Sequence, residues 1–247
     1  MSLLTDSIPE FDGVGDEVLS SSRYRVRNDG SILMIFRTVD RSGSIGDWDL
    51  LPSKHHFYLM DEEGEITSGP ILSMPASNEL MVPAPGRPAV GMPFGFLGHA
   101  RYALSKNNHI FRVWTDDFLF KEFRPDGEFL RAFYYPVEGA PLTPEAAFGY
   151  QDNPVIREGK RNVNFPDTWP VVGDFLIDDE DRIWVSTNGE EEGYKWWVLE
   201  GGGELIARFE WPGDKSIEVV KNGYMYARET DEETGLQKMN RYRFEWN

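Results

Sequence analysis

A tight turn directly before a short apolar strand recurs four times along the chain, and this repeat constrains the fold more than any other feature. The first copy is Asn28-Asp29-Gly30, which precedes Ser31–Phe36. Because Asn, Asp and Gly tolerate the positive φ that tight hairpins demand, each copy predicts a hairpin turn. The other three copies are Lys106-Asn107-Asn108, Asp179-Glu180-Asp181 and Lys221-Asn222-Gly223.

A second turn follows each of these hairpins. Three of the second turns leave through the same Gly-Glu-apolar sequence, at Gly64, Gly127 and Gly203, and the fourth is Asp231–Gly235. Strand, turn, strand, linker, strand, turn, strand is the plan of a four-stranded antiparallel blade of a β-propeller. An unrelated β-sandwich with coincidental turns is the alternative, but the strict alternation of the two turn types favours blades.

The repeat predicts an all-β chain that forms a single β-propeller domain, or a fragment of one, over residues 1–247. Aromatic residues at 14%, with 24 Gly and 16 Pro, agree with short strands and many turns. Two long proline-rich stretches, Ser73–Pro93 and Glu138–Pro170, are expected to be connections between blades. The expected blade units are approximately 20–70, 94–137, 170–212 and 214–247.

The charge balance excludes several partners. Lys and Arg total 25 against 42 Asp and Glu, a formal net charge of −17, which repels nucleic acid and disfavours anionic lipid surfaces. No apolar run approaches the roughly 18 residues of a membrane span, and the first residues lack the features of a signal peptide. The absence of Cys excludes disulfides, thiolate zinc sites and Cys nucleophiles.

The C-terminal residues resemble a known family. The stretch Phe165–Pro170, then Gly173–Val185, then Gly223–Glu229 with Gly235-Leu236-Gln237 and Arg241-Tyr242-Arg243, is similar to the C-terminal part of bacterial six-bladed β-propellers of the TolB-like and NHL types. The resemblance is strongest over residues 94–247 and looser over 20–70. It implies six blades and an extracytoplasmic location, whether periplasmic, secreted or lipid-anchored. It specifies architecture rather than chemistry, since most members are uncharacterised.

The sequence departs from this family in blade number, because four units are visible where the family has six. The last unit supplies three strands only, near Ile217–Val220, Tyr224–Glu229 and Gln237–Glu245. A ring propeller commonly closes by taking its final strand from the N-terminus, and Leu3–Val14 or Val18–Tyr24 could supply it. Otherwise the blades form an open arc that should associate with a second copy.

Two groups of residues are candidate ligand-binding sites. Arg23, Arg101 and Asp174, with His99 beside them, are expected at the mouth of the channel, where arginines could hold a polar or anionic ligand. The alternative is that these charges pair with one another between blades.

The second group lies in the connection Glu138–Pro170. A short helix is predicted there, with Thr143 as N-cap and Pro144 at its first position. A basic cluster follows, which could receive a carboxylate or sulfate group while neighbouring aromatic rings stack on a sugar or peptide. A solvated loop is the alternative. The residues of this group are Arg157, Lys160 and Arg161 with Tyr150 and Trp169.

Signals for catalysis, metals and cofactors are weak. The four His form no HExxH pattern, and Asp178–Asp181 lacks the Gly and distal Glu of a calcium-binding loop. We therefore expect no cofactor or metal and favour a non-catalytic propeller that binds a protein, peptide or glycan on its loop-bearing face. The alternative is a metal-dependent hydrolase or lactonase of the gluconolactonase type, for which Asp174, Glu218 and Asn28 are the only plausible ligands.

Overall fold

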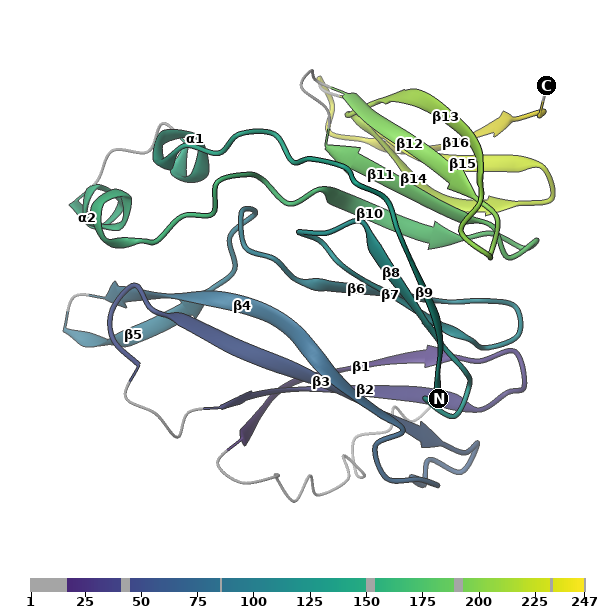
Figure 1. The fold of residues 1–247 in the computed structure, drawn as a ribbon, viewed down its shortest axis with the longest axis horizontal. Coiled ribbons are helices and arrows are strands. Elements are labelled where there is room, and N and C mark those ends of the chain that lie inside the picture. Colours follow the sequence, from purple (N-terminus) through teal and green to yellow (C-terminus); the bar gives the residue numbers. More distant parts are fainter. Residues whose placement is uncertain are drawn as a thin grey trace. The chain divides into compact units, whose positions relative to one another are not determined.

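A computed structural model describes residues 17–40, 45–84, 86–149, 154–188, 193–231 and 233–246. Within these residues the chain folds into four antiparallel β-sheets and two helices, labelled in Figure 1. Each sheet joins strands that are neighbours in sequence, as in the blades of a β-propeller. The prediction of an all-β chain with four blades is confirmed.

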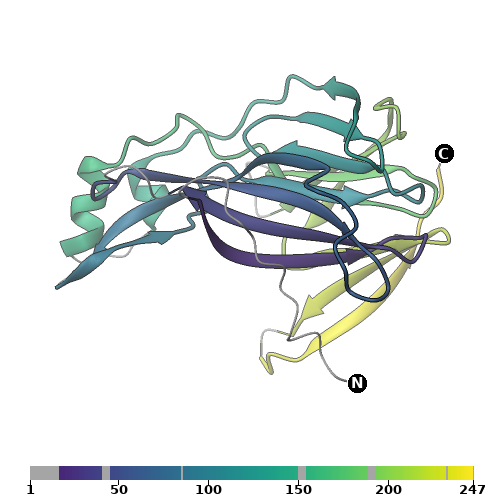
Figure 2. The same ribbon diagram turned by 90° about the horizontal axis from the view of Figure 1, so that it is seen from below.

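The first sheet has five strands in chain order: β1 (Glu17–Val26), β2 (Ile32–Asp40), β3 (Leu50–Met60), β4 (Leu72–Ala84) and β5 (Arg87–Met92). They are the purple to blue strands that run side by side in Figure 2.

The prediction that Ser73–Pro93 is an irregular connection is therefore wrong, because β4 and β5 occupy it. Pro75 and Pro83 misled the sequence reasoning. The ladder shifts register beside Pro75, between Ser53 and Lys54 on β3, and it shifts again across Pro83. Such irregularities accommodate a residue that lacks an N–H.

The other three sheets follow the predicted strand plan. The second contains β6 (Ala100–Leu104), β7 (Ile110–Trp114), β8 (Leu119–Phe123) and β9 (Phe129–Tyr134). The third contains β10 (Val172–Ile177), β11 (Ile183–Asn188), β12 (Gly193–Leu199) and β13 (Leu205–Pro212). The fourth contains β14 (Lys215–Lys221), β15 (Tyr224–Thr230) and β16 (Gln237–Arg243).

The predicted turns have the backbone conformations that their residues favour. In the four hairpins that open the sheets, a residue with positive φ stands at Gly30 (86°), Asn108 (62°), Asp181 (62°) and Asn222 (54°). The four second turns likewise contain a glycine with positive φ. The prediction of eight hairpin turns in alternation is confirmed.

The fourth sheet has three described strands, as the sequence predicts. Of the two segments considered for its missing strand, Val18–Tyr24 lies within β1 and pairs with β2 in the first sheet. The other, Leu3–Val14, lies outside the described residues.

Two helices occupy the connection Glu138–Pro170. The predicted one is α1 (Pro144–Phe148), where the Thr143 hydroxyl accepts a hydrogen bond of 3.1 Å from the Ala146 N–H and Pro144 opens the helix. The second helix, α2 (Pro154–Asn162), was not predicted. Neither described helix has the length and apolar character that a membrane span needs.

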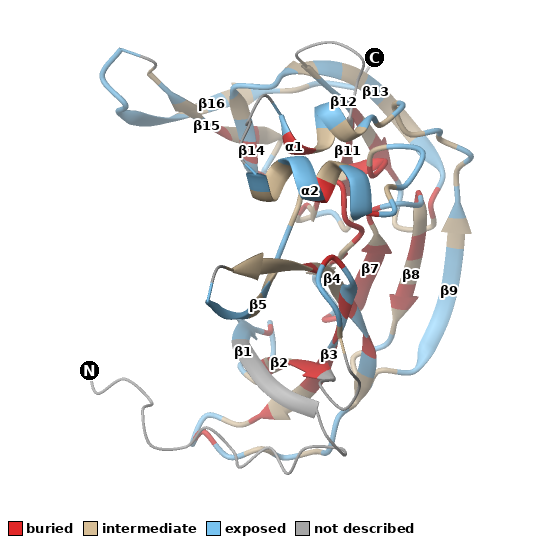
Figure 3. Ribbon diagram, turned by 90° about the vertical axis from the view of Figure 1, so that its left-hand side faces the viewer, coloured by how far each residue is buried: buried red, intermediate tan, exposed pale blue. Residues whose placement is uncertain are grey.

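The described chain divides into two compact units. Unit 1 takes the residues up to Ala100 with Asp126–Glu128 and Pro141–Trp169, and unit 2 takes Arg101–Pro125, Phe129–Ala140 and the residues from Pro170 onward. Unit 1 has an aromatic core around α1 and the end of β4. Unit 2 has two cores, one between the second and third sheets and one between the third and fourth. In Figure 3 the strands β7 and β8 are mostly red, which marks their residues as buried.

Candidate functional site

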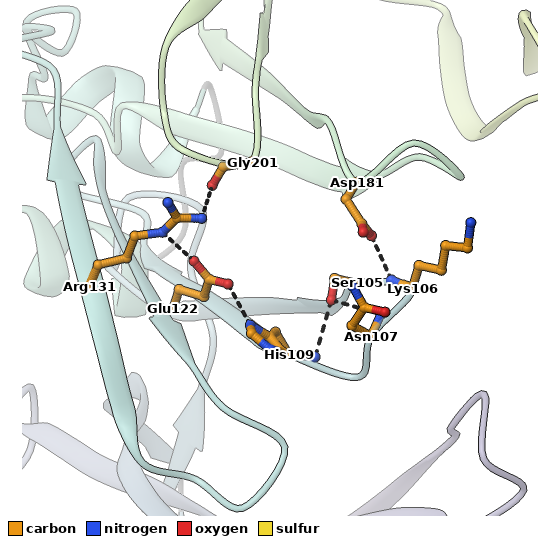
Figure 4. Close-up of polar contacts among 8 residues, drawn as sticks. All are labelled: Ser105, Lys106, Asn107, His109, Glu122, Arg131, Asp181 and Gly201. Carbon is orange, nitrogen blue, oxygen red and sulfur yellow. Dashed lines mark hydrogen bonds and ion pairs between the residues drawn. The ribbon is translucent and has the colours of Figure 1, made fainter.

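A buried carboxylate, Glu122 on β8, is the centre of a charged cluster in unit 2 (Figure 4). Its side chain is only 5% exposed, and its two oxygens have different partners. One lies 2.6 Å from Nδ1 of His109, and the other accepts a hydrogen bond of 2.5 Å from Nε of Arg131 on β9. These contacts give both oxygens of the buried carboxylate a partner, as a buried polar group needs.

The same cluster joins the second sheet to the third. The Arg131 guanidinium donates a second hydrogen bond, of 2.8 Å, to the carbonyl of Gly201 in the turn between β12 and β13. The Tyr135 hydroxyl reaches the same turn and donates to the carbonyl of Gly203 at 2.6 Å. Near the opening hairpins, the N–H of Lys106 donates to Asp181 at 2.6 Å.

These contacts are better suited to holding the second and third sheets together than to acid–base catalysis. Glu122 fixes the orientation of His109, as a carboxylate does in many catalytic dyads. The nearby Ser105 hydroxyl, however, accepts hydrogen bonds from the backbone N–H groups of Asn107, at 3.3 Å, and of His109, at 3.1 Å. Ser105 therefore stabilises the turn. Sequence reasoning missed Glu122 and Arg131, although they lie directly opposite each other in the β8–β9 ladder, where opposite charges attract.

A second buried carboxylate lies in the acidic turn that resembles a calcium loop. The Asp178 side chain has no exposed surface. It accepts hydrogen bonds from the N–H groups of Glu180 and Arg182, both at 2.9 Å, and from Nε of Arg182 and Nε1 of Trp184, at 2.7 and 2.8 Å. Protein donors therefore satisfy this carboxylate. Among the described residues, no group of three or more His, Cys, Asp or Glu is arranged to hold a metal.

The residues predicted at the channel mouth fall in both units. In unit 2, Arg101 on β6 and Asp174 on β10 form an ion pair of 2.8 Å, so the alternative of pairing between blades is confirmed for these two residues. In unit 1, Arg23 is an exposed residue of β1. His99 is half-buried there and forms a β-bridge with Ser77.

The carboxylates nominated as metal ligands of a lactonase also have arginine partners. Besides the ion pair of Asp174 with Arg101, Glu218 accepts a hydrogen bond of 2.8 Å from Nε of Arg228. Asn28 is a residue of unit 1, in the turn between β1 and β2. Each of the two nominated carboxylates is thus paired with an arginine of unit 2.

The predicted basic cluster lies on α2 in unit 1. Arg157 and Arg161 are exposed and Lys160 is half-buried. The predicted aromatic neighbour Trp169 is half-buried and packs against the aromatic core of unit 1. The other aromatic neighbour, Tyr150, lies outside the described residues.

The anchoring of α2 depends on Gly159, the buried residue of the helix. A Cβ at this position would lie 2.8 Å from the Trp48 ring and 3.0 Å from the Phe148 ring. The glycine therefore lets α2 approach the aromatic core of unit 1 closely. The basic residues Arg157, Lys160 and Arg161 lie on this packed helix.

A third charged cluster connects the strands of the fourth sheet. Glu229 on β15 accepts a hydrogen bond from the Tyr242 hydroxyl and forms an ion pair of 3.1 Å with Nζ of Lys215. These contacts, first the hydrogen bond from Tyr242, lower the pKa of Glu229. The same carboxylate raises the pKa of Tyr242 and of Lys215.

The variant Tyr242→Phe is expected to lower the melting temperature at pH 7, because Glu229 loses its main hydrogen-bond donor while the ring contact with Trp211 remains. A carboxyl whose pKa is lower in the folded protein stabilises it above the unfolded pKa of about 4.3, and the effect disappears as pH falls through the folded value. The difference between wild type and variant should therefore close below about pH 4. Thermal melts from pH 3 to pH 8 test this, and a constant difference would contradict it.

Comparisons with known proteins give weak matches. A scan of protein-family models finds no match, and a search of curated proteins finds none. Among solved structures, the chain is similar to a protein of unknown function from Bacteroides caccae, with 12% identity and a TM-score of 0.33, covering 77% of this chain and 54% of that one.

Two further matches are structures named as enzymes. One is a candidate 6-phosphogluconolactonase from Bacteroides fragilis, with 11% identity and a TM-score of 0.35, covering 93% of this chain and 56% of that one. The other is virginiamycin B lyase from Staphylococcus aureus, with 11% identity and a TM-score of 0.32, covering 90% and 83%. The chain spans 54% of the first match and 56% of the candidate lactonase. Such similarities leave the function to be argued from the residues of this chain.

Proposed function

We propose that the chain is a non-catalytic β-propeller of the six-bladed TolB-like or NHL type that binds a protein, peptide or glycan partner. The contact surface that we propose is the basic side of α2, formed by Arg157, Lys160 and Arg161. In this proposal the partner presents carboxylate or sulfate groups. The observation that carries the proposal is that two exposed arginines, one helical turn apart, stand on a helix packed tightly against the core of unit 1.

The electrostatics and the side-chain chemistry support this choice. In a chain with net charge −17, an anionic group is repelled less by a surface that presents arginines than by an acidic one. Arginine forms paired hydrogen bonds with carboxylate and sulfate-like oxygens. Arg157 and Arg161 lie four residues apart and so share one side of the helix. A helix held by packing also loses little conformational freedom when a partner binds.

The existing partners of the candidate carboxylates favour binding over the hydrolase alternative. Asp174 and Glu218 each have an arginine partner, and Asp178 has four protein donors. In a metal-dependent reaction, a cation would have to compete with Arg101 for Asp174 and with Arg228 for Glu218.

Calorimetric titration with a heparin-derived hexasaccharide, a hexaglutamate peptide and neutral maltohexaose tests the proposal. We expect binding of at least one anionic probe and weakening of about tenfold or more in the double variant Arg157→Gln/Arg161→Gln, since charge-assisted hydrogen bonds are lost. The control is Arg25→Gln/Arg87→Gln, which removes the same charge from exposed positions elsewhere in unit 1.

Equal weakening by the two double variants would show that only overall charge matters and would contradict the proposal. A metal-dependent lactone hydrolysis that Asp174→Asn and Glu218→Gln abolish would instead support the hydrolase alternative.

A further inference from the structure

The last strand of the second sheet, β9, has an unusual composition for an edge strand. Its residues Phe129, Leu130 and Tyr134 are 55%, 37% and 59% exposed. In Figure 3 this strand is mostly pale blue, beside the buried β7 and β8. Exposed apolar edge strands are places where another chain can add a strand.

β9 carries fewer charged residues than the last strands of the third and fourth sheets. Its one charged residue, Arg131, uses its guanidinium for Glu122 and the Gly201 carbonyl within unit 2. Charged side chains on an edge normally discourage pairing. The last strand of the third sheet carries Arg208 and Glu210, and the last strand of the fourth sheet carries Lys238, Arg241 and Arg243.

The backbone of β9 offers hydrogen-bonding groups on its outer side. The N–H of Tyr135 donates to the carbonyl of Phe118 on the inner side, at 3.1 Å. In an antiparallel ladder the residues that face the partner strand alternate, so Ala132 and Tyr134 direct their N–H and C=O groups away from β8. Among the described residues, no strand pairs with this side of β9.

A neighbouring turn of the third sheet brings carboxylates close to β9. The turn between β12 and β13 contacts the strand, since it receives the hydrogen bonds of Arg131 and Tyr135 and places Gly203 on the Phe133 ring. This turn carries two exposed carboxylates, Glu200 and Glu204. Together with the net charge of −17, they favour a partner with positive charge and disfavour a second copy of this chain.

We propose that β9 is a docking edge for an extended segment of a partner protein that alternates apolar and basic residues. The segment adds as a further antiparallel or parallel strand and hydrogen-bonds to the backbone of Ala132 and Tyr134. Its apolar side chains cover Leu130 and Tyr134, while its basic side chains approach Glu200 and Glu204. This surface lies in unit 2 and is independent of the one proposed on α2.

The test uses a fluorescein-labelled octapeptide that alternates Lys and Val, with an octapeptide that alternates Glu and Val as its control. Fluorescence anisotropy should show saturable binding of the Lys-Val peptide to the full chain and at least about tenfold weaker binding of the Glu-Val peptide. Binding of the two peptides with equal affinity would overturn the proposal.

Two variants of β9 distinguish strand addition from attraction by charge alone. Ala132→Pro removes an outward N–H while leaving the ladder with β8 complete, because proline is tolerated where the N–H faces solvent. Tyr134→Lys places a like charge at the edge. Each should weaken binding of the Lys-Val peptide by about tenfold. Met239→Lys on β16 adds the same charge at a position that is 57% exposed on another sheet, and should leave the affinity within about twofold.

The melting temperature of each variant establishes that it is folded, and Tyr134→Lys remains informative if Ala132→Pro does not fold. Unchanged affinity in the folded variants would overturn the proposal. A sedimentation mass of a dimer for the wild type, reduced to that of a monomer by Tyr134→Lys, would also overturn it, since the edge would then serve a second copy.

Discussion

Asp178→Asn is expected to lower the free energy of unfolding of unit 2 by about 3–5 kcal/mol, the range found when one partner of a buried ion pair is removed. The loss is large because the Asp178 side chain is fully buried and Arg182 is only 9% exposed. The substituted amide accepts through one atom only, so donors from Arg182 and Trp184 are left without an acceptor. Denaturant unfolding followed by tryptophan fluorescence measures the effect.

Two further variants identify the cause. Asp231→Asn changes an aspartate with the same turn-capping role, whose oxygen accepts from Glu233 and Thr234 in an exposed hairpin, and should cost far less. Asp178→Asn/Arg182→Met removes both charges and leaves an apolar side chain near Phe244 and Trp246, so it should recover part of the stability. Equal effects of Asp178→Asn and Asp231→Asn would contradict the assigned burial.

Gly203→Ala is expected to cost about 2–5 kcal/mol, the sum of backbone strain and overpacking. Gly203 has a φ of 100°, and a Cβ there would lie 2.6 Å from the Phe133 ring. That ring stacks on Phe120 at 5.3 Å, so it has little room to move, and its displacement would disturb the contact between the second and third sheets.

The matched control is Gly235→Ala. Gly235 has a φ of 68°, but a Cβ there would meet nothing within 4 Å, so only backbone strain of about 1–2 kcal/mol is expected. Chemical denaturation of both variants measures the difference, which isolates the close approach to Phe133. If the two variants lose the same stability, the described packing of the turn on β9 is incorrect.

The repeat of hairpins was predictable because it depends on local chemistry. Asn108, Asp181 and Asn222 have the positive φ that few other residues adopt, and their spacing alone defines the strands on either side. Thr143 and Pro144 likewise predicted the start of α1, since capping is also a local interaction.

The errors arose where packing overrides a local signal. Pro75 and Pro83 interrupt the strand pattern of β4, yet irregularities in the ladder accommodate them. Gly159 lowers the helix propensity of α2. A glycine is needed at this position because the helix approaches Trp48 closely, and no local sequence pattern reveals that contact.

The candidate sites show the same division. The sequence alone predicted that Arg101 and Asp174 lie near each other, either to bind a ligand or to pair with one another. The structure shows the ion pair. The burial of Glu122 and Asp178 could not be predicted, because it depends on packing between sheets, such as that of Phe244 and Trp246 on Arg182, the partner of Asp178. If the register of β8 and β9 were known, Glu122 could be paired with Arg131. The sequence alone does not give this register, because it does not show where the bulge in β9 lies.

Hydrogen–deuterium exchange of the full chain with and without the heparin-derived hexasaccharide tests the proposed function most directly, because it locates the bound partner. We expect the added protection to be concentrated in α2, over Pro154–Asn162. It should disappear in Arg157→Gln/Arg161→Gln and remain in Arg25→Gln/Arg87→Gln. Protection around Arg101 and Asp174 with none on α2 would contradict it.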